Sequence, residues 1–252
     1  MSLKFTVVTV VYNAESVIEK TITSVLNQSY PPYEYYIIDG ESSDKTVEIA
    51  KKYSIDFANK GVKYNVISEK DSGIYNAMNK GIELATGDFI SFLNAGDWYE
   101  TDSLKNINEF YNEEEFELTY GSLNYINPDG SSTIKTSKID SFPVSSRHWN
   151  HPSMFLKTDI YKKYKFDETF RAYADFNLYL KLRKDGTKIR VIDKVITNFV
   201  ADGVSTNRDI KKVLERSKEK YKSYIHNGYG KIYFFESYGW EVLKAIYFMI
   251  RS

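Results

Sequence analysis

Residues 88–97, DFISFLNAGD, carry the clearest sign of the fold of this chain. The stretch begins as an apolar run without strict alternation, which is typical of a strand covered on both faces, as in a parallel sheet. It ends in Asn94, Ala95, Gly96 and Asp97, so a carboxylate follows directly after the strand. Open α/β sheets bind ligands outside the carboxyl ends of their strands. The stretch therefore predicts a parallel α/β sheet with a polar site at its edge.

Before this strand, the sequence alternates between strand and helix patterns. Strands are predicted at residues 4–11, 33–39 and 62–67, and helices with a period of about 3.6 residues at residues 14–26, 45–53 and 74–85. Asn13 and Ser72 stand where they can cap the first and the third helix. Strands and helices that alternate with short connections predict an α/β fold with a doubly wound, mostly parallel sheet, whose ligand loops share one edge.

The second half of the chain is less regular. Its expected elements are a helix at 101–111, a hairpin of 118–126 and 132–138, a strand at 150–156, a helix at 175–184 and a strand at 188–200. Because no Gly/Ser-rich or Pro-rich linker interrupts it, residues 1–205 are expected to form one domain. Residues 206–252 are expected to form a helical C-terminal extension.

The composition excludes several classes of site. Lys plus Arg equals Asp plus Glu at 34 each, so no overall basic field favours nucleic acid as a partner. The absence of cysteine excludes disulfides and thiolate zinc sites, and three histidines leave little for an all-histidine metal site. No run of 18 apolar residues, the length that would span a bilayer, occurs in the sequence. We therefore expect a cytoplasmic protein.

Carboxylates recur where the predicted strands end. A single Asp in such a place is more often a turn or cap residue than a ligand. If the strands are parallel, however, Asn13, Asp39, Asp71 and Asp97 share one edge of the sheet. Asp97 could then hold a hard divalent cation against phosphate oxygens. The first strand-to-helix turn, VVYNAES, has neither a GxGxxG nor a P-loop pattern, so side chains must hold any nucleotide.

Longer motifs resemble those of family 2 glycosyltransferases, in the order of that family. They are TVVTVVYNAESVIEKTITSVLNQSY, IIDGESSDKT, EKDSGIYNAMNKGIELATGDFISFLNAGD, HPSMF and RAYADFNLYLKL. The resemblance covers about residues 5–205 and implies a GT-A fold. It also implies transfer of a sugar from a nucleotide-diphosphate sugar to an acceptor hydroxyl, with inversion at the anomeric carbon. The implied setting is bacterial surface-polysaccharide assembly, with a lipid-linked glycan or an oligosaccharide as acceptor.

The resemblance also assigns roles to individual residues. Asp175 would be the catalytic base, and Asp97 would coordinate Mg²⁺ or Mn²⁺ on the donor diphosphate. Asp39 would bind the base, and Asp71 would bind the base or the ribose. The donor site would also include Thr9, Val11, Tyr12, Asn13 and Asn94. From the residues themselves, His151 could reach the diphosphate, the metal or the acceptor, and Arg171 could pair with a phosphate. Asn94 and Gly96 stand where many relatives carry carboxylates, so Asp97 would be the one charged protein ligand of the metal.

Several alternatives stay open at this point. Because the metal motif keeps only one carboxylate, a non-catalytic sugar-nucleotide binding module is also compatible with the sequence. Asp175 could also merely cap a helix. A sugar-phosphate nucleotidyltransferase is disfavoured because VVYNAES lacks a Gly-rich, Arg-containing loop. Residues 213–252 are rich in aromatic and basic side chains, which suits contact with the inner face of the cell membrane. Packing on the catalytic domain or on the partner of a homodimer suits them equally.

Overall fold

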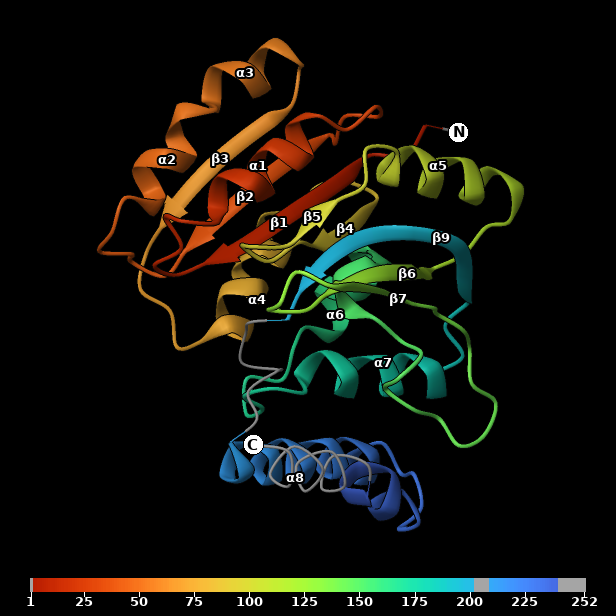
Figure 1. The fold of residues 1–252 in the computed structure, drawn as a ribbon. Helices are drawn as coiled ribbons and strands as arrows, with labels where there is room; N and C mark the ends of the chain where they lie inside the picture. Colours follow the sequence, from red (N-terminus) through yellow and green to blue (C-terminus); the bar gives the residue numbers. More distant parts are fainter. Residues whose placement is uncertain (1, 202–208, 240–252) are drawn as a thin grey trace.

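The computed structural model describes residues 2–201 and 209–239. Within these residues a nine-stranded mixed sheet has the order β3-β2-β1-β4-β8-β6-β9-β5, with β7 paired to β6 (Figure 1). The elements are β1 (Phe5–Val11), α1 (Ile18–Leu26), β2 (Glu34–Asp39), α2 (Thr46–Lys52), α3 (Ser54–Asn59), β3 (Lys63–Ser68), α4 (Ile74–Leu84), β4 (Phe89–Phe92), β5 (Trp98–Tyr99), α5 (Ser103–Glu113), β6 (Leu118–Ile126), β7 (Ser132–Lys135), the 3₁₀ turn η1 (His151–Ser153), β8 (Met154–Lys157), α6 (Thr158–Tyr164), α7 (Ala174–Lys184), β9 (Ile189–Val200) and α8 (Ile210–His226).

The first half forms the predicted parallel sheet. β1 pairs in parallel with β2 and β4, and β2 pairs in parallel with β3, so these strands run the same way in Figure 1. Val8 and Val10 of β1 pack in one hydrophobic cluster with helix α4, whereas Val7 and Val11 pack in another with helix α1. Both faces of β1 are therefore buried, which explains why its sequence shows no alternation.

The second half joins this sheet mainly through antiparallel pairs. β8 is antiparallel to both β4 and β6, whereas β9 runs parallel to β6. The strand expected at 150–156 is shorter than predicted, because residues 151–153 form the turn η1 and β8 begins at Met154. Strand β5 and the helices α3 and α6 were not predicted. The two residues of β5 are a strand only because they pair with β9, a contact that no local pattern encodes.

Both predicted helix caps are wrong. Helix α1 begins at Ile18 with Val17 at its N-cap, and Asn13 lies in the preceding loop with a φ of 47°. The side-chain oxygen of Asn13 instead accepts a hydrogen bond of 2.9 Å from the backbone N–H of Ser43. Helix α4 has Gly73 at its N-cap, and Ser72 makes no capping bond. The Ser72 hydroxyl instead donates to the carboxylate of Glu168 at 3.4 Å, so both polar side chains contact residues outside the helix that they were expected to cap.

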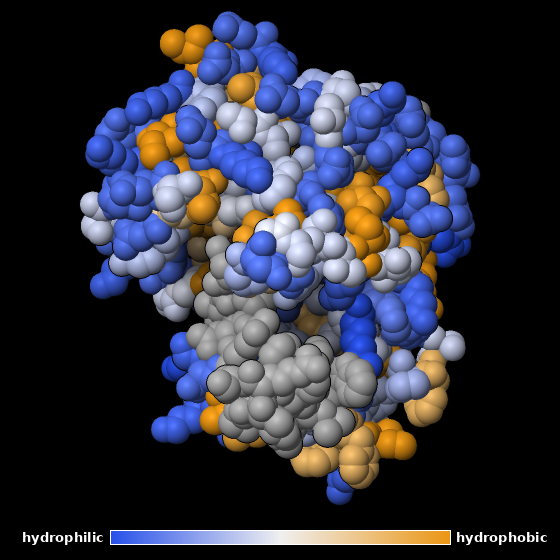
Figure 2. Space-filling view, in the orientation of Figure 1, coloured by the Kyte–Doolittle hydropathy of each residue, from blue (hydrophilic) through white to orange (hydrophobic). Residues whose placement is uncertain are grey.

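The described part of the C-terminal extension packs on the rest of the chain. Helix α8 lies beneath α7 in Figure 1, and Asn227 donates a buried hydrogen bond of 2.9 Å to the side chain of Asn177 on α7. Exposed apolar side chains, including Phe235 with 74% of its surface exposed, occur near this end, where Figure 2 shows hydrophobic residues. Among the described residues, no helix is both long enough and apolar enough to cross a bilayer. Residues 240–252, part of the expected aromatic and basic tail, lie outside the residues that the structure describes.

Candidate active site

Asp39 ends strand β2 and is held entirely by protein groups. Its side chain is fully buried, and its carboxylate accepts hydrogen bonds from Ser42 Oγ at 2.5 Å, Ser42 N at 3.0 Å and Ser68 Oγ at 2.6 Å. Ser68 is the last residue of β3, so the carboxylate ties together the ends of two neighbouring strands. The two serines were not singled out from the sequence, where Ser residues near strand ends are too common to be a signal.

Beside Asp39, a small cradle is formed by Tyr12, Gly40 and Asp71. A Cβ atom on Gly40 would lie 2.6 Å from Asp71 Oδ2 and 3.5 Å from Cδ2 of Tyr12, so a side chain here would push the Asp71 carboxylate aside. The Tyr12 side chain is 65% exposed, whereas Asp71 is fixed by accepting a bond of 2.8 Å from Gly73 N. An exposed aromatic ring can stack on a nucleobase. A neighbouring carboxylate can accept hydrogen bonds from the base or from a ribose hydroxyl.

Thr9 and Val11, which were expected to line the nucleotide pocket, are buried within the protein. Thr9 is fully buried, and its hydroxyl donates to the carbonyl oxygen of Leu93 at 2.7 Å. Val11 is 7% exposed and belongs to the hydrophobic cluster with α1. The structure therefore places both residues inside the sheet, where they support the loops at its edge. Asn13, described above, ties the loops after β1 and β2 together.

The turn from Asn94 to Asp97 is held by helix α1. Gly96 has a φ of 98°, which favours glycine, and its N–H donates to Thr21 Oγ1 at 2.9 Å. The same hydroxyl donates to the carbonyl oxygen of Asp97 at 2.8 Å. Asp97 is 5% exposed and accepts a bond of 3.0 Å from Val200 N on β9. The turn thus holds the Asp97 carboxylate in a defined position.

Asn94 and Asp97 provide the oxygen atoms that a hard divalent cation prefers. The side-chain oxygen of Asn94 is buried and has no hydrogen-bond partner among the described residues. No group of three His, Cys, Asp or Glu side chains in residues 2–201 and 209–239 is arranged to hold a metal. Mg²⁺ commonly binds through one or two carboxylates together with substrate phosphates. The residues present therefore fit a cation that binds together with a diphosphate.

Asp175, in the first turn of α7, is held between two side chains from other elements. Its Oδ1 atom accepts bonds from the Tyr75 hydroxyl at 3.2 Å and from Phe176 N at 2.8 Å. His151 Nδ1 lies 3.7 Å from Asp175 Oδ2. The N-cap of α7 is Tyr173 rather than Asp175, so a capping role does not explain this carboxylate. Tyr75 was not predicted, and nothing in the local sequence marks it.

The electrostatics of this pair follow from burial. Loss of hydration raises the pKa of Asp175, although the nearby His151 and the two hydrogen bonds oppose the shift. Burial lowers the pKa of His151, whose side chain is 8% exposed. The Nε2 atom of His151 is buried without a hydrogen-bond partner among the described residues. A carboxylate whose pKa lies closer to neutrality accepts protons better as a general base.

Contacts connect these groups along one edge of the sheet. Tyr75 lies in the first turn of α4, directly after the loop that contains Asp71, and its hydroxyl donates a hydrogen bond to Asp175. The ring of His151, which faces Asp175, stacks on Phe92 at a centroid distance of 5.8 Å. Phe92 is the last residue of β4 and precedes the Asn94 turn. The structure therefore links the predicted base, the cradle and the Asn94–Asp97 turn through a chain of contacts.

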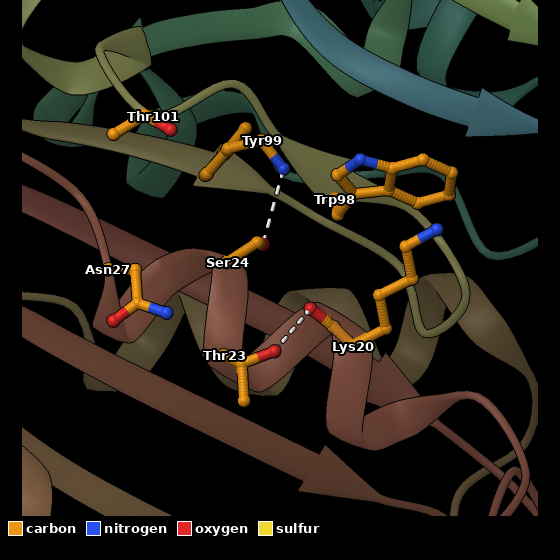
Figure 3. A pocket seen from close by; sticks show the side chains of 7 residues that line it. All are labelled: Lys20, Thr23, Ser24, Asn27, Trp98, Tyr99 and Thr101. Carbon is orange, nitrogen blue, oxygen red and sulfur yellow. Dashed lines mark hydrogen bonds between the residues drawn. The ribbon is translucent and has the colours of Figure 1, made fainter.

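Arg171 makes no contact with the other predicted site residues among the contacts described above. It lies exposed in the loop before α7, where its backbone N–H donates to the carboxylate of Glu219 at 2.9 Å. Two surface hollows are lined by none of the predicted site residues. One, of about 230 Å³, is lined by α1 and β5, with Lys20 Nζ 2.9 Å from the ring centroid of Trp98 (Figure 3). The other, of about 440 Å³, lies beside Asp88 at the opposite ends of the strands.

Two relatives illustrate the sequence similarity. A PGL/p-HBAD biosynthesis glycosyltransferase of Mycobacterium tuberculosis is 33% identical over 121 residues, which is 47% of this chain and 46% of that protein. The match thus spans about half the length of the mycobacterial relative. The Methanococcus voltae dolichyl N-acetyl-α-D-glucosaminyl phosphate 3-β-D-2,3-diacetamido-2,3-dideoxy-β-D-glucuronosyltransferase is 30% identical over 226 residues, which is 82% of this chain and 68% of that protein.

Solved structures share the fold. S. aureus TarS 1–349 in complex with UDP-GlcNAc superposes with a TM-score of 0.65 at 20% identity, over 84% of this chain and 66% of TarS. The mannosyltransferase PcManGT from Pyrobaculum calidifontis, in complex with GDP-Man and Mn²⁺, gives a TM-score of 0.67 at 15% identity, over 98% of this chain and 74% of PcManGT. The predicted α/β fold of the GT-A type is confirmed. The profile of the family Glycosyl transferase family 2 matches residues 6–181, and this chain belongs to that family.

Proposed function

We propose that the chain transfers a sugar from a nucleotide-diphosphate sugar to an acceptor hydroxyl with inversion, using Asp175 as the base. The observation that carries the proposal is the placement of Asp175 between Tyr75 and His151, near the Asn94–Asp97 turn. Membership of the family supports glycosyl transfer as the reaction. Residues 1–205 would form the catalytic domain.

In this mechanism the acceptor hydroxyl attacks the anomeric carbon while its proton passes to a carboxylate oxygen of Asp175. The bond between the anomeric carbon and the diphosphate oxygen breaks, and its electron pair leaves with the diphosphate. Attack from the opposite face inverts the configuration at this carbon. The hydroxyl of Tyr75 orients the carboxylate, and burial, which raises the pKa of Asp175, favours the protonated product of the transfer.

The donor would be held at the sheet edge. Tyr12 and Asp71 would contact the nucleoside, with Asp39 supporting the loops around it. Asp97 and Asn94 would hold Mg²⁺ or Mn²⁺ against the diphosphate. When bound, such a cation stabilises the negative charge that develops on the leaving oxygen. The complex of PcManGT with GDP-Man and Mn²⁺ supports the choice of cofactor, and TarS with UDP-GlcNAc supports the class of donor.

The proposed acceptor is a lipid-linked glycan or an oligosaccharide in the assembly of a cell-surface polysaccharide. The Methanococcus voltae relative, which is named for a dolichyl N-acetyl-α-D-glucosaminyl phosphate, supports a lipid-linked acceptor. We place the protein in the cytoplasm, at the inner face of the membrane when it meets such an acceptor. Flotation with anionic liposomes tests this placement: recovery of all protein in the unbound fraction would contradict it.

The Asp175→Asn variant tests the proposal directly. Release of nucleoside diphosphate is measured with UDP-, GDP-, dTDP- and CDP-sugars, with Mn²⁺ and a candidate acceptor. General-base help is typically worth about 10²- to 10⁴-fold, so the variant should lose turnover by that order. Its affinity for the nucleoside diphosphate should stay unchanged. Near-normal turnover would refute the role of Asp175, and binding of donors without any turnover by the natural protein would favour a non-catalytic binding module.

A further inference from the structure

Helix α8 and its C-cap residue Asn227 make a row of hydrogen bonds to the segment that carries Asp175. The bonds fall on residues 169–177, which lead into α7 and form its first turn, and α8 lies directly beneath α7 in Figure 1. They join Lys222 Nζ to Thr169 Oγ1 at 3.2 Å, Glu219 to the N–H groups of Arg171 and Ala172, Ser223 Oγ to Tyr173 O at 3.5 Å, and Asn227 Nδ2 to Asn177 Oδ1 at 2.9 Å.

Glu219 makes the strongest of these contacts. Its carboxylate accepts from the N–H of Arg171 at 2.9 Å and from the N–H of Ala172 at 2.8 Å. Hydrogen bonds to an ionised acceptor are roughly twice as strong as neutral ones. Both N–H groups directly precede the N-cap of α7, where a negative charge also interacts favourably with the helix dipole. Glu219 therefore fixes the backbone three residues before Asp175.

The same loop is also held from its other side. Glu168 accepts hydrogen bonds from Asn76 Nδ2 at 3.1 Å and from Asn79 Nδ2 at 2.9 Å, both on α4. Helix α4 also carries Tyr75, which donates to Asp175. The loop is thus clamped between α4 and α8. Without α8 the loop would keep only its contacts to α4, so the position of Asp175 relative to Tyr75 would be less firmly fixed.

We infer that Glu219 is a positioning residue for the catalytic base, and that helix α8 acts as a support for the active site. This inference rests on the proposed function, in which Asp175 accepts the proton of the acceptor hydroxyl. A displacement of about 1 Å in a catalytic group can cost about 10²-fold in rate. Helix α8 lies beyond residues 6–181, which the family profile matches, and it would therefore influence the rate of the chemical step.

The first experiment compares Glu219→Ala with a matched control. The control is Glu215→Ala, one turn earlier on the exposed surface of α8. We expect Glu219→Ala to lower kcat by about 10- to 100-fold with an unchanged KM for the donor, because the base moves while the donor site does not. Glu219→Gln should recover part of this loss, since its amide oxygen can accept from one of the N–H groups. Glu215→Ala should match the natural protein. Equal kcat values for both alanine variants would overturn the inference.

A double-mutant cycle with Asp175→Asn separates positioning from a general structural effect. If Glu219 acts through Asp175, adding Glu219→Ala to Asp175→Asn should cause no further loss of the residual turnover. An equal loss in both backgrounds would overturn the inference, because Glu219 would then act on another group. If Glu219→Ala fails to fold in a thermal unfolding assay, Glu219→Gln takes its place in the cycle. Failure of the proposed function itself would appear earlier, as normal turnover of Asp175→Asn alone.

Discussion

Among single residues, Asp175 is the proposed base, and its ionised form should also lower the stability of the folded protein. Burial raises the pKa of Asp175 in the folded protein, so the folded state binds its proton more tightly than the unfolded state does. Stability from this group is therefore present at pH values below the unfolded pKa and is lost as the pH rises through the folded pKa. At neutral pH the ionised carboxylate should lower the free energy of unfolding.

The Asp175→Asn variant should consequently be more stable than the natural protein at neutral pH. The amide oxygen of Asn can still accept from the Tyr75 hydroxyl and from Phe176 N, the two donors that reach Oδ1. Urea unfolding at neutral pH should show a higher free energy of unfolding for the variant, and the difference should disappear at a pH below the unfolded pKa of Asp. A variant that is less stable at both pH values would contradict this expectation.

The pH dependence of the reaction follows from the same shift. Asp175 must be ionised to accept a proton, and its pKa is raised by burial. The acid limb of kcat/KM should therefore lie above the ordinary carboxyl pKa of about 3.9. Initial rates across the acid range, at pH values where circular dichroism shows the fold intact, measure this limb. A profile that is flat down to the ordinary carboxyl range would argue against Asp175 as the base.

At the scale of elements, the end of strand β2 controls the shape of the donor cradle. Gly40 has no side chain, and a Cβ atom there would meet Asp71 Oδ2 at 2.6 Å. Gly40→Ala should therefore displace the Asp71 carboxylate and weaken binding of the nucleoside diphosphate, with little change in the fold. Isothermal titration calorimetry measures the affinity. Gly230→Ala is the matched control, because nothing lies within 4 Å of its added Cβ. Equal affinities for the two variants would contradict the role of the cradle.

The elements also differ in how far the sequence predicts them. Helix α4 can be predicted because its apolar residues recur with a helical period, and strands β1 to β4 because they are short apolar runs, of which β1, β2 and β4 are buried on both faces. Strand β5 and the antiparallel place of β8 cannot be, because they depend on pairing with β9 and with β4. Local periodicity reports which face of an element is buried. It carries no information about which distant strand covers an edge.

At the scale of the whole molecule, donor and cation should stabilise the protein together. A ligand that binds only the folded state raises stability by RT ln(1 + [L]/Kd). If Asp97 and Asn94 hold a cation that binds with the diphosphate, nucleoside diphosphate and Mn²⁺ together should raise the Tm more than the sum of their separate effects. Asp97→Asn, which can still accept from Val200 N, should remove this excess. Equal shifts with and without Mn²⁺ would indicate a donor site that works without metal.

The parallel α/β half and the family resemblance can be read from the chain alone, because apolar patterns and motif order are properties of the local sequence. The sequence also named the carboxylates Asp39, Asp71, Asp97 and Asp175. The neighbours of these carboxylates appear only in the folded protein: serines around Asp39, Tyr75 and His151 at Asp175, and Glu219 at the loop before Asp175. These partners come from segments far apart in the chain. Packing of whole elements sets their distances, so no local pattern could reveal them.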